Sequence, residues 1–186
     1  MQDQVQRGWA GCRNCLSLFF SWWPTEPILS SDFQPKPSGL CPGTSAADLH
    51  HVPRPGWSYC QLTLFPADTS GPFAGVTQRG FHRCTRCQGL FFPVGDSPDR
   101  CWGPAVPSGI GIAGASLVEP RHEAGEEYVL PLSWRPFDHV MEGWEVCASC
   151  RLLVYTRDQG NHGACTAGGP HHGITLDLGV EYWRPG

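Results

Sequence analysis

The sequence has very little lysine. Lys36 is the single one, and the 13 basic residues form no run of Arg and Lys. A nucleic-acid partner normally requires a basic face that displaces counterions from phosphates, so a net charge of −4 makes nucleic-acid binding an unfavoured function. Long apolar runs are missing as well. The apolar stretch Leu16–Trp23 is interrupted by Ser17 and Ser21 and is too short to cross a bilayer, so no membrane span is predicted.

Sustained helical periodicity is also absent, and no small-residue cleavage site marks an export signal. The abundant residues are glycine, proline and cysteine, at 23, 18 and 10. Glycine and proline favour short strands joined by tight turns, which predicts an all-β protein. Many cysteines indicate disulfides in a secreted protein and metal sites in a reducing compartment. The missing export signal favours the second reading and a cytoplasmic location.

One sequence unit occurs three times. Each copy has a glycine and an aromatic residue, then a Cys-x-x-Cys pair, then a short apolar run. The glycine–aromatic pairs are Gly8-Trp9, Gly80-Phe81 and Gly143-Trp144, and the apolar runs are Leu18–Phe20, Leu90–Phe92 and Leu153–Tyr155. A repeated order of features indicates internal duplication. We therefore predict a single domain over residues 1–186, made of unit 1 (8–79), unit 2 (80–142) and unit 3 (143–186).

Each unit is typical of a strand, a Cys-x-x-Cys turn, a second strand, a loop and a returning strand. A Gly-x-x-Tyr step marks the returning strand: Gly56 to Tyr59, Gly125 to Tyr128 and Gly179 to Tyr182. The last strand could pair back to the N-terminal segment. Closure of this kind removes sheet edges, so we predict a pseudo-threefold, β-trefoil-like body. The alternative is a linear array of three zinc-ribbon-like units.

A third cysteine and a histidine follow each Cys-x-x-Cys pair. Four Cys or His side chains bind a tetrahedral structural zinc ion, and a Cys-x-x-Cys turn supplies two of them. The predicted ligands are Cys12, Cys15, Cys41 and His51 (site 1); Cys84, Cys87, Cys101 and His122 (site 2); and Cys147, Cys150, Cys165 and His171 (site 3). In His50-His51 and His171-His172 the neighbouring histidine is an alternative ligand. Cys3His sites leave no open position for water, so three structural Zn²⁺ ions are predicted.

Competing interpretations concern the chemistry of the cysteines. Disulfides fit badly, because three equal triads hold an odd number of thiols. Iron also binds thiolates, but zinc is the usual ion for Cys3His. Cys60 is left over, and its place in a strand-like segment predicts a buried apolar residue.

The sequence contains no catalytic or cofactor-binding motif in the structural context that such a motif requires. The stretch Gly109–Gly114 matches G-x-G-x-x-G but follows Pro107-Ser108 rather than a strand. No P-loop or G-x-S-x-G is present, and no acid–base pair or nucleophile stands out. The chain is therefore predicted not to be an enzyme. An enzyme with a loop-borne active site is the alternative.

Three segments carry a resemblance to a known repeat: Cys84–Phe92, Cys165–His171 and Gly125–Leu130. Together they resemble the Cys-x-x-Cys-Gln-Gly-Leu-Phe-Phe … Cys-Pro-Ala-Gly-Gly-x-His repeat of bacterial and fungal zinc-ribbon-like proteins. The resemblance implies the repeated zinc-binding architecture and no particular activity. The chain departs from it where Arg151-Leu152 replaces Gln-Gly, and where units 1 and 2 lack the Gly-Gly-x-His step.

For function, the sequence favours a non-catalytic binding or structural module that presents variable loops to a protein or glycan partner. Trp22, Trp23, Trp102 and Trp134 lie off the repeated aromatic position and are candidate contact residues, although tryptophans that cap the core locally are the commoner case. A nucleic-acid-binding zinc protein is a further alternative.

Overall fold

The computed structural model describes residues 5–21, 41–43, 50–55, 60–64, 77–93, 101, 121–132, 139–157 and 162–182, of which the side chains of 175–177 are left aside. Nine strands lie in these residues: β1 (Val5–Gly11), β2 (Leu18–Phe20), β3 (Cys60–Leu64), β4 (Thr77–Cys84), β5 (Leu90–Phe91), β6 (Ala124–Pro131), β7 (Val140–Cys147), β8 (Leu153–Tyr155) and β9 (Gly173–Tyr182). The described residues contain no helix, and hence none that could cross a membrane. The predicted all-β class is confirmed.

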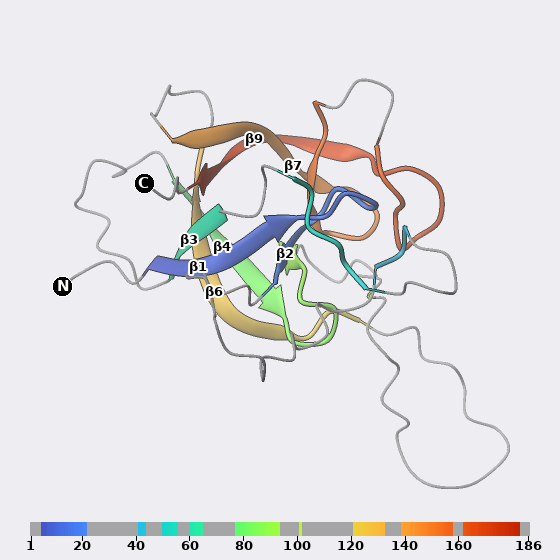
Figure 1. Cartoon of the computed structure of the whole chain (residues 1–186), viewed down its shortest axis with the longest axis horizontal. Coiled ribbons are helices and arrows are strands. Elements are labelled where there is room, and N and C mark those ends of the chain that lie inside the picture. Colours follow the sequence, from blue (N-terminus) through green and yellow to red (C-terminus); the bar gives the residue numbers. More distant parts are fainter. Residues whose placement is uncertain are drawn as a thin grey trace, which may run out of the picture.

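All nine strands belong to one curled sheet (Figure 1). Its order is β5-β4-β6-β3-β9-β7-β8, and β1 pairs with β3 and with β2 beside this path. Each unit contributes the same three strands. The strand before the Cys-x-x-Cys turn pairs antiparallel with the short strand after it and with the returning strand, as β4 does with β5 and β6. The predicted order of elements within a unit is therefore the order observed.

A ring of backbone hydrogen bonds joins the tips of the three Cys-x-x-Cys hairpins. Phe20 N–H of unit 1 donates to Gln88 O of unit 2 (2.9 Å), Phe92 N–H of unit 2 to Arg151 O of unit 3 (3.0 Å), and Tyr155 N–H of unit 3 to Leu16 O of unit 1 (3.0 Å). Each donor therefore lies in one unit and its acceptor in the next, and the cycle closes. The three units form a ring rather than a row. The specific comparison with a β-trefoil stays a prediction.

The acceptors in this ring follow the second cysteine of each turn and have left-handed backbone. Their φ values are 59° for Leu16, 62° for Gln88 and 64° for Arg151, a region that non-glycine residues rarely occupy. The turn requires it, because the N–H of each of these residues returns to the carbonyl of the first cysteine, as Gln88 does to Cys84 (2.9 Å). The same turn aims the carbonyl at the neighbouring unit.

Aromatic pairs from all three units fill the core inside the sheet. The strand aromatic packs on the end of the apolar run across each hairpin: Trp9 on Phe20 (5.4 Å between ring centroids), Phe81 on Phe92 (5.0 Å) and Trp144 on Tyr155 (5.5 Å). The same pairing therefore recurs in all three units. The buried members of the cluster are Trp9, Leu18, Phe20, Cys60, Leu62, Phe81, Leu90, Tyr128, Leu130, Trp144, Val146, Leu153, Leu178 and Val180.

The returning strands correct one part of the prediction. Trp9 lies opposite Cys60, Phe81 opposite Tyr128 and Trp144 opposite Leu178. The counterpart of Tyr128 is therefore Cys60 in unit 1 and Leu178 in unit 3, and the matches to Tyr59 and Tyr182 were wrong. The end of β9 runs on to pair Tyr182 with Cys60, so the last strand reaches unit 1 through β3 rather than through the N-terminal β1. Burial of the residue opposite the aromatic sets this register, whatever its chemical type.

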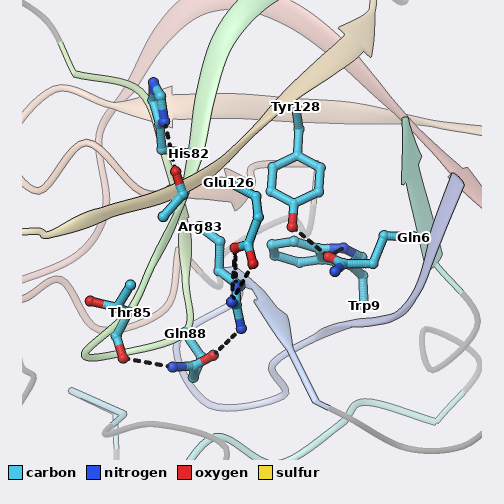
Figure 2. Close-up of polar contacts among 9 residues, drawn as sticks. Gln6, Trp9, His82, Arg83, Thr85, Gln88, Glu126 and Tyr128 are labelled. Atoms are coloured by element: carbon cyan, nitrogen blue, oxygen red, sulfur yellow. Dashed lines mark hydrogen bonds and ion pairs between the residues drawn. The ribbon is translucent and has the colours of Figure 1, made fainter. Parts of the chain in front are cut away.

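Polar side chains join unit 1 to unit 2 beside the core (Figure 2). Gln6 Oε1 accepts hydrogen bonds from Trp9 Nε1–H (3.2 Å) and from the Tyr128 hydroxyl. Arg83 donates from Nε (2.8 Å) and Nη2 (2.9 Å) to the two oxygens of Glu126, and its guanidinium lies 5.1 Å from the Phe20 ring centroid. Figure 2 shows the Arg83–Glu126 pair next to the Tyr128, Gln6 and Trp9 side chains. The part-buried bonds of Gln6 satisfy polar atoms of Trp9 and Tyr128 that the packing of two units would otherwise isolate, whereas the Arg83–Glu126 pair is exposed.

Candidate metal centres

The Cys-x-x-Cys turns place two thiols of each site at a hairpin tip. The turns lie between β1 and β2, between β4 and β5, and between β7 and β8. The third cysteine and the histidine come from the loop that leads to the returning strand. In every unit the ligand atoms of the four predicted residues lie within 4.8 Å of one another, and eleven of the twelve residues are buried, with His122 half-buried. The structure thus brings together the residues of sites 1, 2 and 3 as the sequence predicts.

Backbone hydrogen bonds identify the ligand in each His-His pair. The residue after the first cysteine donates to the carbonyl of the residue after the ligand histidine: Arg13 N–H to Val52 O (2.9 Å), Thr85 N–H to Glu123 O (3.0 Å) and Ala148 N–H to His172 O (2.7 Å). This shared bond brings His51 and His171 to the thiols and turns their neighbours outward. His50 and His172 are exposed.

The distances between the donor atoms fit a tetrahedral zinc ion. Bonds of about 2.3 Å to sulfur and about 2.0–2.1 Å to nitrogen imply S–S edges of about 3.8 Å and S–N edges of about 3.6 Å. The Sγ–Sγ distances Cys12–Cys41, Cys84–Cys101 and Cys147–Cys165 are 3.6, 3.6 and 3.8 Å. The Sγ–Nδ1 distances Cys15–His51, Cys87–His122 and Cys150–His171 are 3.4, 3.5 and 3.5 Å. All ten cysteines are outside disulfides.

The electrostatics of the clusters also favour a cation. Burial lowers the pKa of His122, but hydrogen bonds and the negative charge of Cys101 and Cys84 outweigh it and raise the pKa to about 10. Hydrogen bonds from Cys101 and Cys87 lower the pKa of Cys84, while hydrogen bonds to Cys101 and Cys84 raise the pKa of Cys87. The buried thiols therefore cannot all ionise unless a positive ion joins them. Three Cys3His groups of this kind are structural zinc sites.

Contacts around the ligands include a stacking partner that the sequence reasoning missed. The middle residue of the apolar run lies flat on the ligand histidine: Phe19 on His51 at 4.7 Å and 18°, and Phe91 on His122 at 4.7 Å and 19°. Unit 3 has Val154 at this position. The signal was present in the sequence, since the Leu-Phe-Phe run contains one more aromatic than the core pairing needs. Stacking fixes the ring plane and so orients Nδ1 toward the sulfurs.

A prediction concerns Gly163, which packs against the turn of another unit. A Cβ at this position would lie 2.4 Å from the carbonyl oxygen of Cys15, and the backbone φ is +62°. The obstacle is backbone held by site 1, so it cannot move aside as a flexible side chain would. We expect Gly163→Ala to lower the free energy of unfolding by about 2–5 kcal/mol, from left-handed strain and overpacking together. Urea titration of the zinc-loaded protein measures it.

The matched control for this change is Gly168→Ala. Gly168 also has a positive φ of +91°, but no heavy atom lies within 4 Å of a Cβ placed there. Its substitution should cost only the backbone strain, about 1–2 kcal/mol. Equal losses in the two variants would contradict the close contact between Gly163 and Cys15.

Cys60 is the one cysteine outside the three sites. It is buried in β3, as predicted, and burial raises the pKa of its thiol to about 12. The raised pKa holds the thiol neutral in the folded state, and thiols react as thiolates. We expect no cysteine of the zinc-loaded protein to react with a thiol reagent at pH 8, and all ten to react after denaturation in chelator.

The matching variant is Cys60→Ala, which should still bind three zinc ions. The pKa of the Cys60 thiol is higher in the folded than in the unfolded state, so folding gains stability from keeping the thiol neutral. This contribution is complete at pH values below the unfolded-state pKa of about 8.5. This contribution is lost as the pH rises toward 12. The difference in unfolding free energy between wild type and variant should therefore shrink over that interval. If Cys60→Ala bound only two zinc ions, the result would indicate that Cys60 is a metal ligand and would contradict this prediction.

Comparison of the chain with known protein families, with curated proteins and with solved structures gives no significant match. The resemblance to the zinc-ribbon-like repeat proteins therefore stays a prediction. The candidate contact residues Trp22, Trp23, Trp102 and Trp134 lie outside the described residues, as does the glycine-rich stretch 109–114.

Proposed function

We propose that the protein is a non-catalytic, zinc-stabilised module that presents its variable loops to a protein or glycan partner. The observation that carries the proposal is the full donor set of each metal site. Three thiols and one imidazole nitrogen lie together in each site and would fill all four positions of a tetrahedral zinc ion. No position is left for a water molecule that zinc could activate, so each ion is suited to hold the chain rather than to perform chemistry.

The described acidic residues near site 2 also support a non-catalytic role. Glu126 accepts from Arg83 at 2.8 Å, Glu123 accepts from Arg86 at 3.1 Å, and Glu127 accepts from Gly80 N–H at 3.2 Å. These carboxylates are engaged in ion pairs and hydrogen bonds on the surface of the sheet. Each of the three therefore already has a basic or backbone donor as its partner.

The attachment of the variable segments supports a presenting role. The segment 22–40 lies between Ser21, which donates to Gly8 O (2.7 Å), and the ligand Cys41. The segment 102–120 begins directly after the ligand Cys101 and ends two residues before the ligand His122. Both carry tryptophan, and both are attached to a metal-held frame at each end. A rigid frame with variable connecting segments is the usual arrangement of a binding scaffold.

The test is binding by the zinc-loaded protein to a glycan array and to a protein interaction panel, compared with Trp22→Ala/Trp23→Ala. We expect a specific partner whose signal falls at least about tenfold in the variant, because large aromatic side chains dominate such contacts. Three bound zinc ions in the variant establish that the frame is intact. Absence of any glycan or protein partner would refute the proposal, and salt-sensitive retention of DNA or RNA would favour the nucleic-acid alternative.

A further inference from the structure

Two of the three metal sites touch through their ligands. The ring nitrogen Nε2 of His122 donates a hydrogen bond to the backbone carbonyl of Cys150 at 3.0 Å. His122 belongs to site 2 and Cys150 to site 3, and each uses a different atom, Nδ1 or Sγ, toward its own ion. One hydrogen bond therefore joins a ligand of one ion to a ligand of another.

The surroundings of these two sites are also shared. The cysteines of sites 2 and 3 pack in one buried cluster together with Phe91, Leu152 and Val154. Site 1 lies in a separate cluster, in which its cysteines pack with Ala10 and Phe19. Hairpin contact by itself does not distinguish this pair, because all three hairpins touch: Phe91 bridges to Leu152, Phe19 to Gly89 and Ser17 to Val154. The bond between ligands and the shared cluster are what set sites 2 and 3 apart from site 1.

The hydrogen bond has a direct effect on ligand strength. A proton held on Nε2 by a carbonyl leaves the Nδ1 lone pair for the metal, fixes the ring plane and increases the basicity of the ligand. The Cys150 carbonyl lies in the turn of unit 3, and an ion bound by Cys147 and Cys150 would hold that turn in addition to its backbone hydrogen bonds. An ion in site 3 would thus help to keep His122 in the tautomer and orientation that bind the ion of site 2.

We propose that zinc occupancy of sites 2 and 3 is coupled, and that this coupling is stronger than the coupling of either site to site 1. Loss of the ion from one member of the pair weakens the other. Because coupling free energies are reciprocal, removal of the His122–Cys150 bond loosens site 3 as well as site 2. The chain then has one pair of sites that fills and empties together, and a third that responds separately.

The first experiment removes an equivalent ligand from site 3 or from site 1, with Cys165→Ser and Cys41→Ser. Each zinc-loaded variant is exposed to limiting chelator and an alkylating reagent, and mass spectrometry follows the modification of Cys84 and Cys87. Second-sphere contacts change metal affinity by about 10–100-fold, so site 2 should be alkylated at least about tenfold faster in Cys165→Ser than in Cys41→Ser. Equal rates overturn the proposal.

The second experiment keeps four ligands in every site, so it does not depend on the folding of a three-ligand variant. His122→Cys supplies a thiolate in place of Nδ1 but removes the ring N–H that Cys150 accepts, and His51→Cys makes the same ligand change in site 1. The readout is alkylation of Cys147 and Cys150. We expect at least a tenfold increase with His122→Cys and no change with His51→Cys. The same rate in both variants overturns the proposal.

Discussion

A strong chelator should unfold the reduced protein and abolish its β-sheet signal in far-ultraviolet circular dichroism. Structural zinc contributes on the order of 10 kcal/mol per site at neutral pH in zinc-finger peptides, and a folded domain has a net stability of only about 5–15 kcal/mol. Three sites hold the hairpin tips, and their cysteines make up much of two of the three buried clusters found among the described residues. Loss of the ions leaves crowded thiols and imidazoles with no cation to balance them.

Elemental analysis should first give three zinc ions per chain, one for each Cys3His site. Addition of Zn²⁺ after chelation should restore the dichroism signal, and chelator already saturated with zinc is the control that separates metal removal from other effects of the reagent. Purified reduced protein that contains no metal and keeps its fold in excess chelator would contradict the three sites.

Trp9→Ala should cause the largest loss among single changes in the core outside the metal sites. The Trp9 ring is fully buried and makes edge contacts with Phe20 at 5.4 Å and Tyr128 at 5.1 Å between centroids. Tyr128 belongs to unit 2, so truncation opens a cavity where two units meet. Tryptophan-to-alanine changes in cores cost about 3–5 kcal/mol, and urea unfolding of the zinc-loaded protein measures the loss.

Trp9→Phe is the matched control, because the protein itself uses phenylalanine at the equivalent place in unit 2. There Phe81 packs on Phe92 at 5.0 Å. The variant should lose about 1–2 kcal/mol, from the hydrogen bond that Trp9 Nε1 donates to Gln6 (3.2 Å) and from the smaller ring. If phenylalanine costs as much as alanine, the equivalence of Trp9 and Phe81 is wrong.

The metal ligands could be predicted from the sequence because zinc chemistry leaves its pattern along the chain. Cys84 and Cys87 are three positions apart in one turn, and the same order of ligands recurs in three copies. The choice within His50-His51 could not be made in this way, since adjacent residues have the same chemistry. It depends on the bond from Arg13 N–H to Val52 O, which turns one histidine toward the thiols.

The register of the returning strands escaped prediction for a related reason. A tyrosine at Tyr182 matches Tyr128 in type, but the residue opposite Trp144 is Leu178. Packing opposite an aromatic ring demands apolar area and burial, which leucine, tyrosine and cysteine each provide. Residue type therefore gave the wrong alignment where cross-strand position gives the right one.

The sequence by itself determined that the chain is all-β, that it is built from three copies of one unit, and that each copy binds zinc through Cys3His. These properties depend on local patterns: turn residues, short apolar runs and ligand spacing. Tertiary structure alone decided between the predicted closed body and its linear alternative, through the backbone bonds that join the hairpin tips, and placed His122 of site 2 against the Cys150 carbonyl of site 3. The acceptors in these contacts are backbone carbonyls, which every residue has, so no side-chain pattern in the sequence predicts them.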